Sequence, residues 1–376
     1  MSDSVTSGTP DSSGQVADTS EMAGDAGAQT RTPDVETATR GATLLSPTGA
    51  KYARILSVGS YRPERVVTND EICERIDSSD QWIRERSGIV SRRFAAADET
   101  VTDMAQRASE VALQRAGLTG ADIDVVLVAT ISHPYQTPSS ATLLAHRLGA
   151  TPAAAFDVSA ACAGFSHGVG LANDMVRGGS ATNVLVVGAE KLSDFTDLTD
   201  RGSAFIFADG AGAVVVGPSE EAGIGPTLWG SDGGMWDAIT QKHAWTDMRD
   251  GKEGRVTDWP DLTMAGQSVF RWAVWQMAPV ARKTIEAAGI EPGDLAAFIP
   301  HQANVRIIDA MVKQLALPEH VPVSRDIETS GNTSAASIPL AMDRMLAEDP
   351  TLSGGLGLLI GFGAGLSYAA QVVRLP

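Results

Sequence analysis

The sequence predicts an α/β protein, because near-continuous apolar segments of strand length alternate with helical segments. Strands that are apolar on both faces imply a mostly parallel sheet covered by helices on both sides. A weak internal echo is the second observation: Ala116-Gly-Leu, Asp122-Ile and a strand recur as Ala288-Gly-Ile, Asp294-Leu and a strand. The echo favours two duplicated halves, although helix, turn and strand form a common unit that also recurs by chance.

The predicted elements follow one another in a regular order once the folded body begins near Lys51. The first buried strand starts at Ala53. Further strands are expected at 123–130, 154–158, 184–188 and 297–299, and helices at 139–148 and 164–176. The N-terminal half would span residues 51–220 and the C-terminal half residues 221–376.

Residues 1–50 are predicted to form a disordered tail. They are rich in Ser, Thr, Gly, Ala and Asp, they contain no aromatic residue, and they have neither helical nor strand periodicity. Such a segment cannot bury enough apolar surface to offset the entropy of ordering. Nothing in its composition indicates a role.

The overall composition argues against several classes of protein. The chain has no run of about 18 apolar residues and no basic-then-apolar N-terminus, so we expect a cytoplasmic protein with neither a membrane span nor a signal peptide. Its formal charge of −17 argues against nucleic acid as a partner. Two cysteines, Cys73 and Cys162, are too few for a disulfide framework, so at least one is a candidate for a working thiol.

Cys162 is the candidate nucleophile. It lies in Phe156-Asp-Val-Ser-Ala-Ala-Cys-Ala-Gly-Phe, between a predicted strand and a predicted helix. A helix N-terminus favours the thiolate, so the pKa of the thiol is expected to fall below ~8.5. The alternative is a small buried hydrophobic residue, which is the usual role of a lone cysteine. Cys73, placed in the middle of a predicted helix between charged residues, is expected only to pack.

Two further residues have side chains suited to stabilise an oxyanion. His301 follows an apolar strand, where a neutral imidazole would donate through Nε2 to a developing negative charge. Asn332 lies in Gly331-Asn-Thr-Ser-Ala-Ala-Ser, before a helix that begins near Ser334, and its amide donor stays neutral at any working pH. A backbone-bonded loop histidine and a helix-capping asparagine are the structural alternatives.

A glycine-rich turn, Gly361-Phe-Gly-Ala-Gly, follows one of the last apolar strands. It lacks the Lys-Ser/Thr ending of a phosphate loop, and no clear helix follows it. We therefore expect backbone packed against a ligand, with its amides directed at an oxyanion.

Together these segments resemble the β-ketoacyl-acyl-carrier-protein synthase III family of the thiolase-like condensing enzymes, from about Arg54 to Leu375. The motifs that carry the resemblance are Arg65-Val-Val-Thr-Asn, Asp80-Gln-Trp-Ile-Arg-Glu-Arg-Ser-Gly-Ile, Ala160-Ala-Cys-Ala-Gly-Phe, Asp200-Arg-Gly, Phe207-Ala-Asp-Gly-Ala-Gly-Ala, Pro300-His-Gln-Ala-Asn, Gly331-Asn-Thr-Ser-Ala-Ala-Ser-Ile-Pro and Gly361-Phe-Gly-Ala-Gly.

The resemblance implies a five-layered αβαβα fold of two duplicated halves, assembled as a homodimer, with no metal and no cofactor. It implies a multifunctional acyltransferase of type II fatty acid biosynthesis that uses Cys162, His301 and Asn332. Cys162 would take an acyl group from acyl-CoA, and decarboxylating malonyl-acyl carrier protein would then be joined to it. Backbone amides at Cys162 and Ala364 would hold the oxyanion, although many relatives have glycine in place of Ala364.

Substrate contacts also follow from the resemblance. Trp82 and Arg201 would sandwich the adenine of CoA, Arg86 would meet phosphate, and Asn304 would touch the pantetheine arm. Packing and surface charge are the simpler roles for these residues. Carrier-protein docking would use Gln302, Arg306 and Lys313. Thr137 would lie near the tip of a loop that caps the partner's acyl pocket, where a small residue suggests room for a starter longer than acetyl.

Four alternatives stay open at this point. A ketosynthase that primes polyketide assembly or a type III polyketide synthase would share the same three residues. A Cys-His-Asn hydrolase would have them in the same order along the chain. A non-catalytic partner subunit would keep the fold without the reaction.

Overall fold

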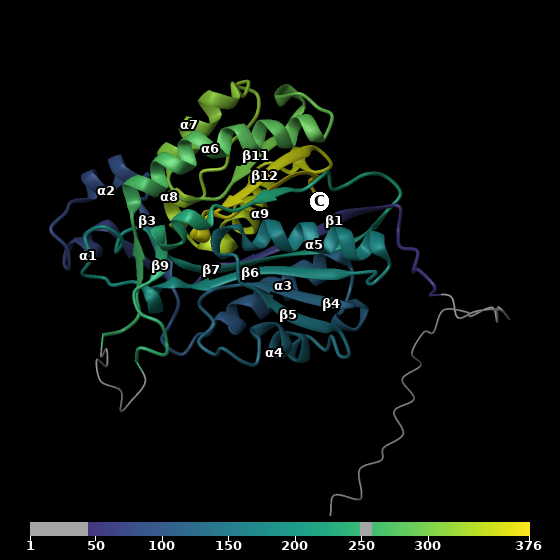
Figure 1. Ribbon diagram of the computed structural model, residues 1–376, viewed down its shortest axis with the longest axis horizontal. Helices are drawn as coiled ribbons and strands as arrows, with labels where there is room; N and C mark the ends of the chain where they lie inside the picture. The colour runs from purple at the N-terminus through teal and green to yellow at the C-terminus, as the bar shows by residue number, and fades with distance from the viewer. Residues whose placement is uncertain (1–43, 249–257) are drawn as a thin grey trace, which may run out of the picture. The chain divides into compact units, whose positions relative to one another are not determined.

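The computed structural model describes residues 44–248 and 258–376, and residues 47–376 form one compact unit. The predicted tail lies almost entirely outside the described residues, so its disorder stays a prediction. Within the compact unit, two mixed sheets alternate with three layers of helices (Figure 1). This is the five-layered thiolase-like fold that the resemblance implies.

The first sheet has the strand order β1-β7-β6-β4-β5. Its strands are β1 (Tyr52–Tyr61), β7 (Asp209–Ser219), β6 (Val184–Lys191), β4 (Val125–Ala129) and β5 (Ala154–Val158). All eight residues of β6 are buried, as expected for a central strand covered on both faces. On its outer face lie α3 (Val101–Ala116) and α4 (Ser140–Arg147).

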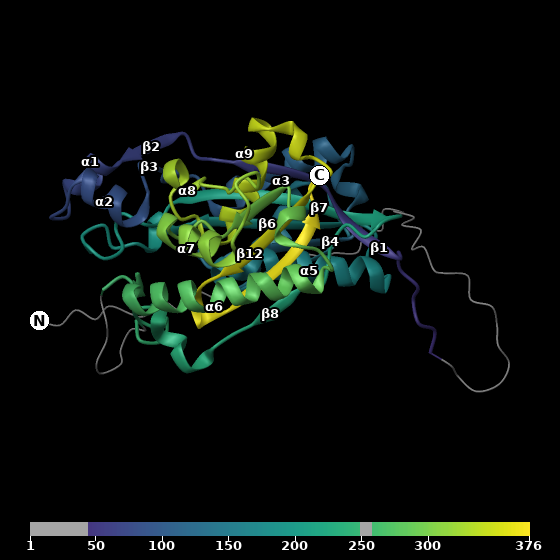
Figure 2. The ribbon, with the colours of Figure 1, turned by 90° about the horizontal axis from the view of Figure 1, so that it is seen from above.

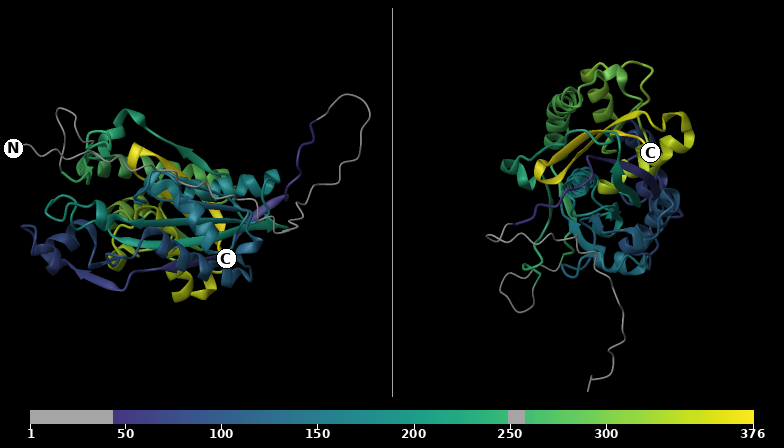
Figure 3. Two further views of the ribbon diagram at one scale, coloured as in Figure 1. Left: turned by 90° about the horizontal axis from the view of Figure 1, so that it is seen from below. Right: turned by 90° about the vertical axis from the view of Figure 1, so that its right-hand side faces the viewer.

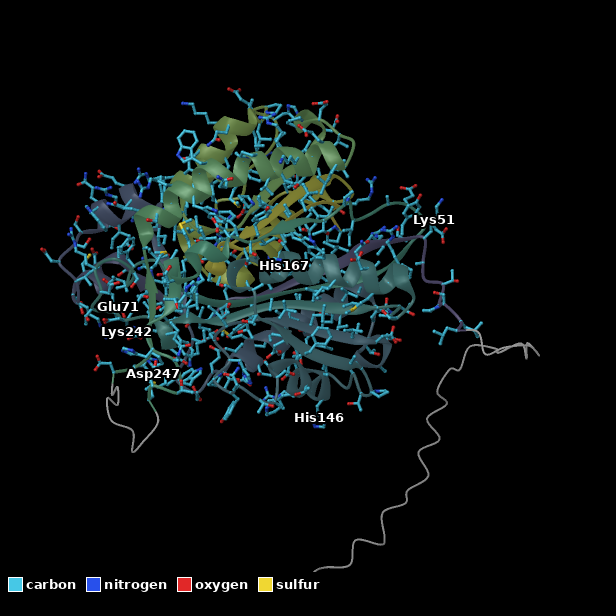
Figure 4. All side chains as sticks on the ribbon, viewed as in Figure 1. Lys51, Glu71, His146, His167, Lys242 and Asp247 are labelled. Atoms are coloured by element: carbon cyan, nitrogen blue, oxygen red, sulfur yellow. The ribbon has the colours of Figure 1, made fainter. Side chains whose placement is uncertain are left out.

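The second sheet has the order β11-β12-β13-β8 and comes from the C-terminal part of the chain. Its strands are β11 (Ala297–Pro300), β12 (Leu356–Phe362), β13 (Tyr368–Arg374) and β8 (Leu228–Gly230). Helices α6 (Gly266–Ala287) and α7 (Val305–Leu315) cover the outer face, and they lie beyond the yellow strands in the right view of Figure 3. The strands of the first sheet lie within residues 52–219 and those of the second within residues 228–374. The division into duplicated halves at residues 51–220 and 221–376 stays a prediction.

The central layer consists of α5 (Gly164–Gly178) and α9 (Ser337–Glu348), which contact both sheets. Their buried apolar side chains join the inner faces of the two sheets in one core that includes Phe165, Val169, Ile338 and Leu359. Because both helices begin beside the active-site loops, this core fixes where those loops lie.

A smaller group of elements gathers at one end of the sheets (Figures 1 and 2). It contains β2 (Arg65–Thr68), β3 (Ser91–Phe94), α1 (Asn69–Cys73), α2 (Asp80–Ser87) and α8 (Ile327–Ser330). A separate hairpin pairs β9 (Ile239–Gln241) with β10 (Leu262–Met264). The fully buried Arg92 of β3 donates to Asn69 and to the Phe205 carbonyl, which joins this group to the body.

Two sequence predictions about the fold need correction. The sheets are mixed rather than mostly parallel: β4 is parallel to β5 and β6, but β7 runs antiparallel to β1 and β6. Buried antiparallel strands are as apolar as parallel ones, so the pattern alone does not distinguish them. Cys73 is the last residue of the short helix α1 and not mid-helical.

Candidate active site

Cys162 lies in a turn of 3₁₀ helix, Ala161–Ala163, that leads directly into α5. The preceding Ala161 has a φ of 45°, a left-handed conformation that is uncommon for alanine and that turns the chain sharply from β5 toward α5. Cys162 is a free thiol, half-buried, and lines a pocket of about 1280 Å³. The predicted location between strand and helix is confirmed.

The glycine turn after β12 packs against this thiol. A Cβ built on Gly363 would lie 2.8 Å from the Cβ of Cys162 and 2.9 Å from its Sγ, and a Cβ on Gly361 would lie 3.0 Å from the Cys162 carbonyl oxygen. Only residues without a Cβ permit this approach. The turn expected from the sequence to face a ligand therefore also forms the wall beside the nucleophile.

Ala364 lines the pocket between Gly363 and Gly365. The positive φ of the turn, 67°, falls on Gly365, and Ala364 is not among the residues with positive φ. The Gly363 amide donates to the Ser367 carbonyl at 3.0 Å. The Cβ of Ala364 thus causes no backbone strain, and its amide stays a candidate for the second oxyanion donor.

His301 follows β11 directly and is buried in the same pocket. Its Nδ1 lies 2.7 Å from the Ser337 hydroxyl, which also accepts from the Gln302 amide at 3.3 Å. We infer that the Ser337 hydroxyl donates to Nδ1. The ring hydrogen then lies on Nε2, and Nε2–H remains available as a donor. Burial lowers the pKa of His301 to about 3, so the imidazole is neutral, as the sequence predicts.

Asn332 also lines the pocket, and its side chain is buried. Its backbone pairs with the 206–208 segment through Asn332 N to Ile206 O and Ala208 N to Asn332 O, both 2.9 Å. Its Oδ1 accepts from the Ser334 amide at 2.9 Å, so Nδ2 remains as the free donor. Cys162, His301 and Asn332 therefore meet at one pocket from three distant parts of the chain.

The pKa of the Cys162 thiol differs from the sequence prediction. The pKa is raised to about 12, mainly by burial and to a lesser degree by the Glu190 carboxylate, while Ser334 and the amide of Cys162 itself oppose the rise. Desolvation of a charge in this pocket therefore outweighs the helix N-terminus. In the resting site both Cys162 and His301 are neutral, so activation needs a proton acceptor at the moment of attack.

The residues predicted to contact CoA form one cluster. The guanidinium carbons of Arg86 and Arg201 lie 5.6 Å and 5.0 Å from the centre of the Trp82 ring. Asn304 lines the pocket, caps α7, and donates to the Arg86 carbonyl at 2.9 Å. These four residues are brought together, but Arg201 stacks on Trp82 itself, so an adenine would have to separate them.

One predicted docking residue is placed wrongly. Gln302 is fully buried: its amide nitrogen donates to the carbonyls of Pro300 and Ser324, and its Oε1 accepts from the Ile327 amide. These hydrogen bonds join the loops around His301, and the buried Gln302 side chain cannot contact a carrier protein. Arg306 and Lys313 are exposed on α7 two turns apart, where Arg306 also lies over the Phe270 ring at 5.1 Å.

Thr137 is exposed and does not line the pocket of its own chain, although Tyr135 and Gln136 of the same loop do. Sequence reasoning missed Ser337, Ser334 and Glu190. The two serines lie within the small-residue motif around Asn332, but nothing in that motif separates them from packing residues. Glu190 follows closely on the apolar strand predicted at 184–188, and a carboxylate in that place is the one signal that the sequence offered.

Among the described residues, no group of three or more His, Cys, Asp or Glu side chains is placed to hold a metal ion. None of the helices in residues 44–248 and 258–376 is both long and apolar enough to span a membrane.

A half-buried cysteine at the start of the central helix, faced by a neutral histidine and an asparagine, defines the site of a thiolase-like condensing enzyme. Models of 3-oxoacyl-[acyl-carrier-protein] synthase III match residues 156–233, and for its C-terminal part residues 285–375. The chain belongs to the β-ketoacyl-[acyl-carrier-protein] synthase III family, whose members are condensing acyltransferases.

Its relatives are similar over most of their length. The chain is 59% identical to β-ketoacyl-[acyl-carrier-protein] synthase III 1 of Streptomyces coelicolor, over 87% of this chain and 98% of that protein. The chain is 55% identical to the synthase III of Mycobacteroides abscessus, over 88% of this chain and 96% of that protein. Among solved structures, the priming β-ketosynthase of the R1128 polyketide pathway is 49% identical, with a TM-score of 0.85 over 89% of this chain and 98% of that one. The synthase III of Aquifex aeolicus is 38% identical, with a TM-score of 0.78 over 86% of this chain and 99% of that one.

Gly363→Ala should displace the nucleophile. The new Cβ would fall 2.9 Å from the Cys162 Sγ, closer than atoms of these types approach, so the thiol or the turn has to move. A displacement of about 1 Å costs on the order of 100-fold in rate. We expect that loss in acyl transfer to Cys162, measured by mass spectrometry against time. Gly178→Ala, in helix α5 with no atom within 4 Å of the new Cβ, is the control and should acylate normally. Equal rates in both variants would contradict the close packing.

Proposed function

We propose that this chain catalyses the initiating condensation of type II fatty acid biosynthesis, with Cys162 as nucleophile and His301 and Asn332 as donors to the enolate. The observation that carries the proposal is the convergence of these three side chains on one pocket. The curated relatives at 55–59% identity bear names of the same activity.

The first half-reaction uses Cys162. Its sulfur attacks the thioester carbonyl of acyl-CoA, the carbon–sulfur bond to CoA breaks, and an acyl-cysteine and free CoA result. The amides of Cys162 and Ala364 would hold the oxyanion of the tetrahedral intermediate. The neutral state of the resting site allows an acyl chain to enter a pocket that has few charges.

The second half-reaction uses His301 and Asn332. Malonyl-acyl carrier protein loses carbon dioxide, and the enolate oxygen accepts hydrogen bonds from Nε2–H of His301 and Nδ2–H of Asn332. The enolate carbon attacks the acyl-cysteine carbonyl, which releases the Cys162 sulfur and 3-oxoacyl-acyl carrier protein. Two neutral donors suit an anion that forms in a dry site, because they are oriented before the charge appears.

Separate loss of the two half-reactions tests these roles. His301→Ala should still take up label from acyl-CoA at Cys162, while the rate of condensation falls by about 10²–10³, as for loss of one oxyanion donor. Cys162→Ser should lose labelling. Quench-flow measurement of acyl-enzyme and product distinguishes the two steps, and equal loss of labelling in both variants would contradict the assignment.

The same assay addresses the alternatives. A hydrolase would release the acyl group when no malonyl donor is present, whereas a condensing enzyme should retain it. A non-catalytic subunit would show no mass gain at Cys162. A type III polyketide synthase would accept malonyl-CoA in place of malonyl-acyl carrier protein. The curated relatives at 55–59% identity are named β-ketoacyl-[acyl-carrier-protein] synthase III, which favours the fatty acid reaction, while the 49% identity to the polyketide-priming ketosynthase keeps that reaction as the second candidate.

Substrate docking is proposed at two surfaces. Trp82, Arg86, Arg201 and Asn304 would bind the nucleotide and pantetheine of CoA at the pocket rim. Arg306 and Lys313 would attract the acidic carrier protein to α7, against the long-range repulsion of a chain with charge −17. The preference for a starter longer than acetyl stays a prediction.

Arg306→Glu should raise KM for malonyl-acyl carrier protein several-fold and leave acyl-CoA uptake nearly unchanged. Reversal of an exposed positive charge mainly slows the association with an acidic partner. Because salt screens this interaction, the increase in KM should become smaller as salt is added. Steady-state rates at two salt concentrations measure this. Arg177→Glu, an exposed reversal in the last turn of α5, is the matched control. An unchanged KM for Arg306→Glu would remove α7 from the docking surface.

A homodimer through the edge strand β5 is part of the proposal. Among the described strands, β5 pairs only with β4, and its outward Phe156 is 39% exposed. Leu143 of the adjacent α4 is 42% exposed and Tyr135 is 68% exposed, which extends the apolar surface. A second copy paired along β5 would cover the unpaired edge and these side chains. Thr137 would then lie close to the partner's pocket.

Phe156→Glu should convert the dimer to monomer, because two introduced charges would face each other across the pairing strands. Light scattering coupled to size exclusion measures the mass. Trp275→Glu, which also replaces an exposed aromatic, 69% exposed on α6, is the control and should leave the mass unchanged. A wild-type chain that elutes as a monomer would contradict this assembly.

A further inference from the structure

The mechanism above needs a group that accepts the proton of Cys162, because burial keeps the thiol protonated in the resting site. His301 is a weak base here, since burial lowers its pKa to about 3. A further titratable group whose charge acts on the sulfur is the carboxylate of Glu190, which raises the pKa of the thiol.

Glu190 is buried completely near the end of β6. One oxygen, Oε2, accepts hydrogen bonds from the Thr130 hydroxyl at 3.2 Å, from the Ile131 amide at 3.1 Å and from the Ser132 hydroxyl. The other oxygen, Oε1, has no hydrogen-bond partner among the described residues. A buried carboxylate held by one oxygen and free at the other is costly for stability, which favours a use for the free oxygen.

The loop that carries Ser334 packs against the face of β6 to which Glu190 belongs. A Cβ built on Gly188 would lie 2.2 Å from the Ala335 carbonyl oxygen, so the loop backbone rests directly on β6 there. Glu190 is two residues further along the strand, and side chains at i and i+2 point to the same face. Burial places Glu190 behind the pocket wall, while Ser334 and Cys162 line the pocket itself.

Ser334 connects the two groups. Its 3₁₀ turn, Ser334–Ala336, packs against the turn that carries Cys162 and against β6, which carries Glu190. Its hydroxyl has no hydrogen-bond partner among the described residues, and it lowers the pKa of both Cys162 and Glu190. Ser334 has a φ of 48°, a conformation that serine rarely adopts, and the side chain of Asn332 holds its amide at 2.9 Å. Backbone strain maintained in this way is typical of functional positions.

We propose that Glu190 accepts the proton of Cys162 through the hydroxyl of Ser334, which makes both of them positioning residues for acylation. The thiol proton passes to the Ser334 oxygen as the Ser334 proton passes to Oε1, so a thiol and a carboxylate become a thiolate and a carboxylic acid. The thiolate then attacks the thioester. The departing CoA sulfur takes the proton back by the reverse route, and no other reactant is needed.

Transfer of the proton from the thiol, whose pKa is about 12, to Glu190 is uphill, so little thiolate forms at any moment and the attack on the thioester has to consume it. Burial raises the pKa of Glu190 to about 7, although its hydrogen bonds oppose the change. A base with a pKa near the working pH is the most effective. Other charged groups near Glu190 are engaged elsewhere: Lys191 donates to the Ala96 carbonyl, and Asp209 accepts from Ser193 and from the Ala95 amide.

This inference rests on the proposed function, but alkylation of Cys162 tests it without substrate. The rate of reaction with iodoacetamide, followed by mass spectrometry of the Cys162 peptide, should rise with pH as Glu190 deprotonates, with a midpoint near 7, and reach a plateau. Glu190→Gln should lose this rise and react at least 10-fold more slowly at pH 8. Ser334→Ala should do the same, and the double variant should add no further loss.

The opposite result would overturn the proposal. A carboxylate that acts only as a nearby charge raises the pKa of the thiol, so Glu190→Gln would then react faster at pH 8. An unchanged alkylation rate in Glu190→Gln would also contradict the proposal. Asp209→Asn, which neutralises another buried carboxylate whose pKa burial raises to about 6, should keep the wild-type profile.

Ser334→Ala keeps the test decisive if Glu190→Gln fails to fold. A wild-type chain that alkylates with the expected profile but forms no acyl-enzyme from acyl-CoA would instead count against the proposed function.

Discussion

The close approach of the Gly361–Gly365 turn to Cys162 is the contact on which the site depends. It brings the end of β12, in the second sheet, against the start of α5, and both are held by the core between the sheets. A side chain at Gly363 would push the sulfur away from the turn whose amide is to hold the oxyanion. The five-layered fold thus sets the position of one sulfur atom relative to one loop.

Two neutral groups characterise the resting pocket. Desolvation keeps the Cys162 thiol protonated and the His301 imidazole unprotonated, so no ion pair forms between them. Hydrogen bonds from the surrounding loops then decide which atoms act: Ser337 leaves Nε2–H of His301 as a donor, and the Ser334 amide leaves Nδ2 of Asn332 as a donor. The site is therefore preorganised for an anion that forms during reaction, and we assign the proton transfer to Ser334 in the pocket wall and Glu190 behind it.

Much of the fold was predictable from local sequence. The strands at 154–158 and 184–188 and the helix that starts at Gly164 lie where the apolar pattern placed them, because burial on both faces leaves a strong signal. The positions of Cys162, His301 and Asn332 at element boundaries were predictable for the same reason. Strand direction was not, since parallel and antiparallel buried strands share one pattern. The burial of Gln302, the partners of His301 and the place of Glu190 depend on contacts between residues at least 22 positions apart in sequence, which no local pattern encodes.

A crystal structure of the acyl-enzyme, formed with acyl-CoA, would show whether the Gly361–Gly365 turn and Cys162 hold the reacting carbonyl group. We expect an acyl group on Cys162 Sγ, with its carbonyl oxygen about 2.7–3.1 Å from the amides of Cys162 and Ala364, and with His301 Nε2 and Asn332 Nδ2 facing the space beside the acyl carbon. An acyl group on another residue, or a carbonyl oxygen directed away from the Gly361–Gly365 turn, would contradict it.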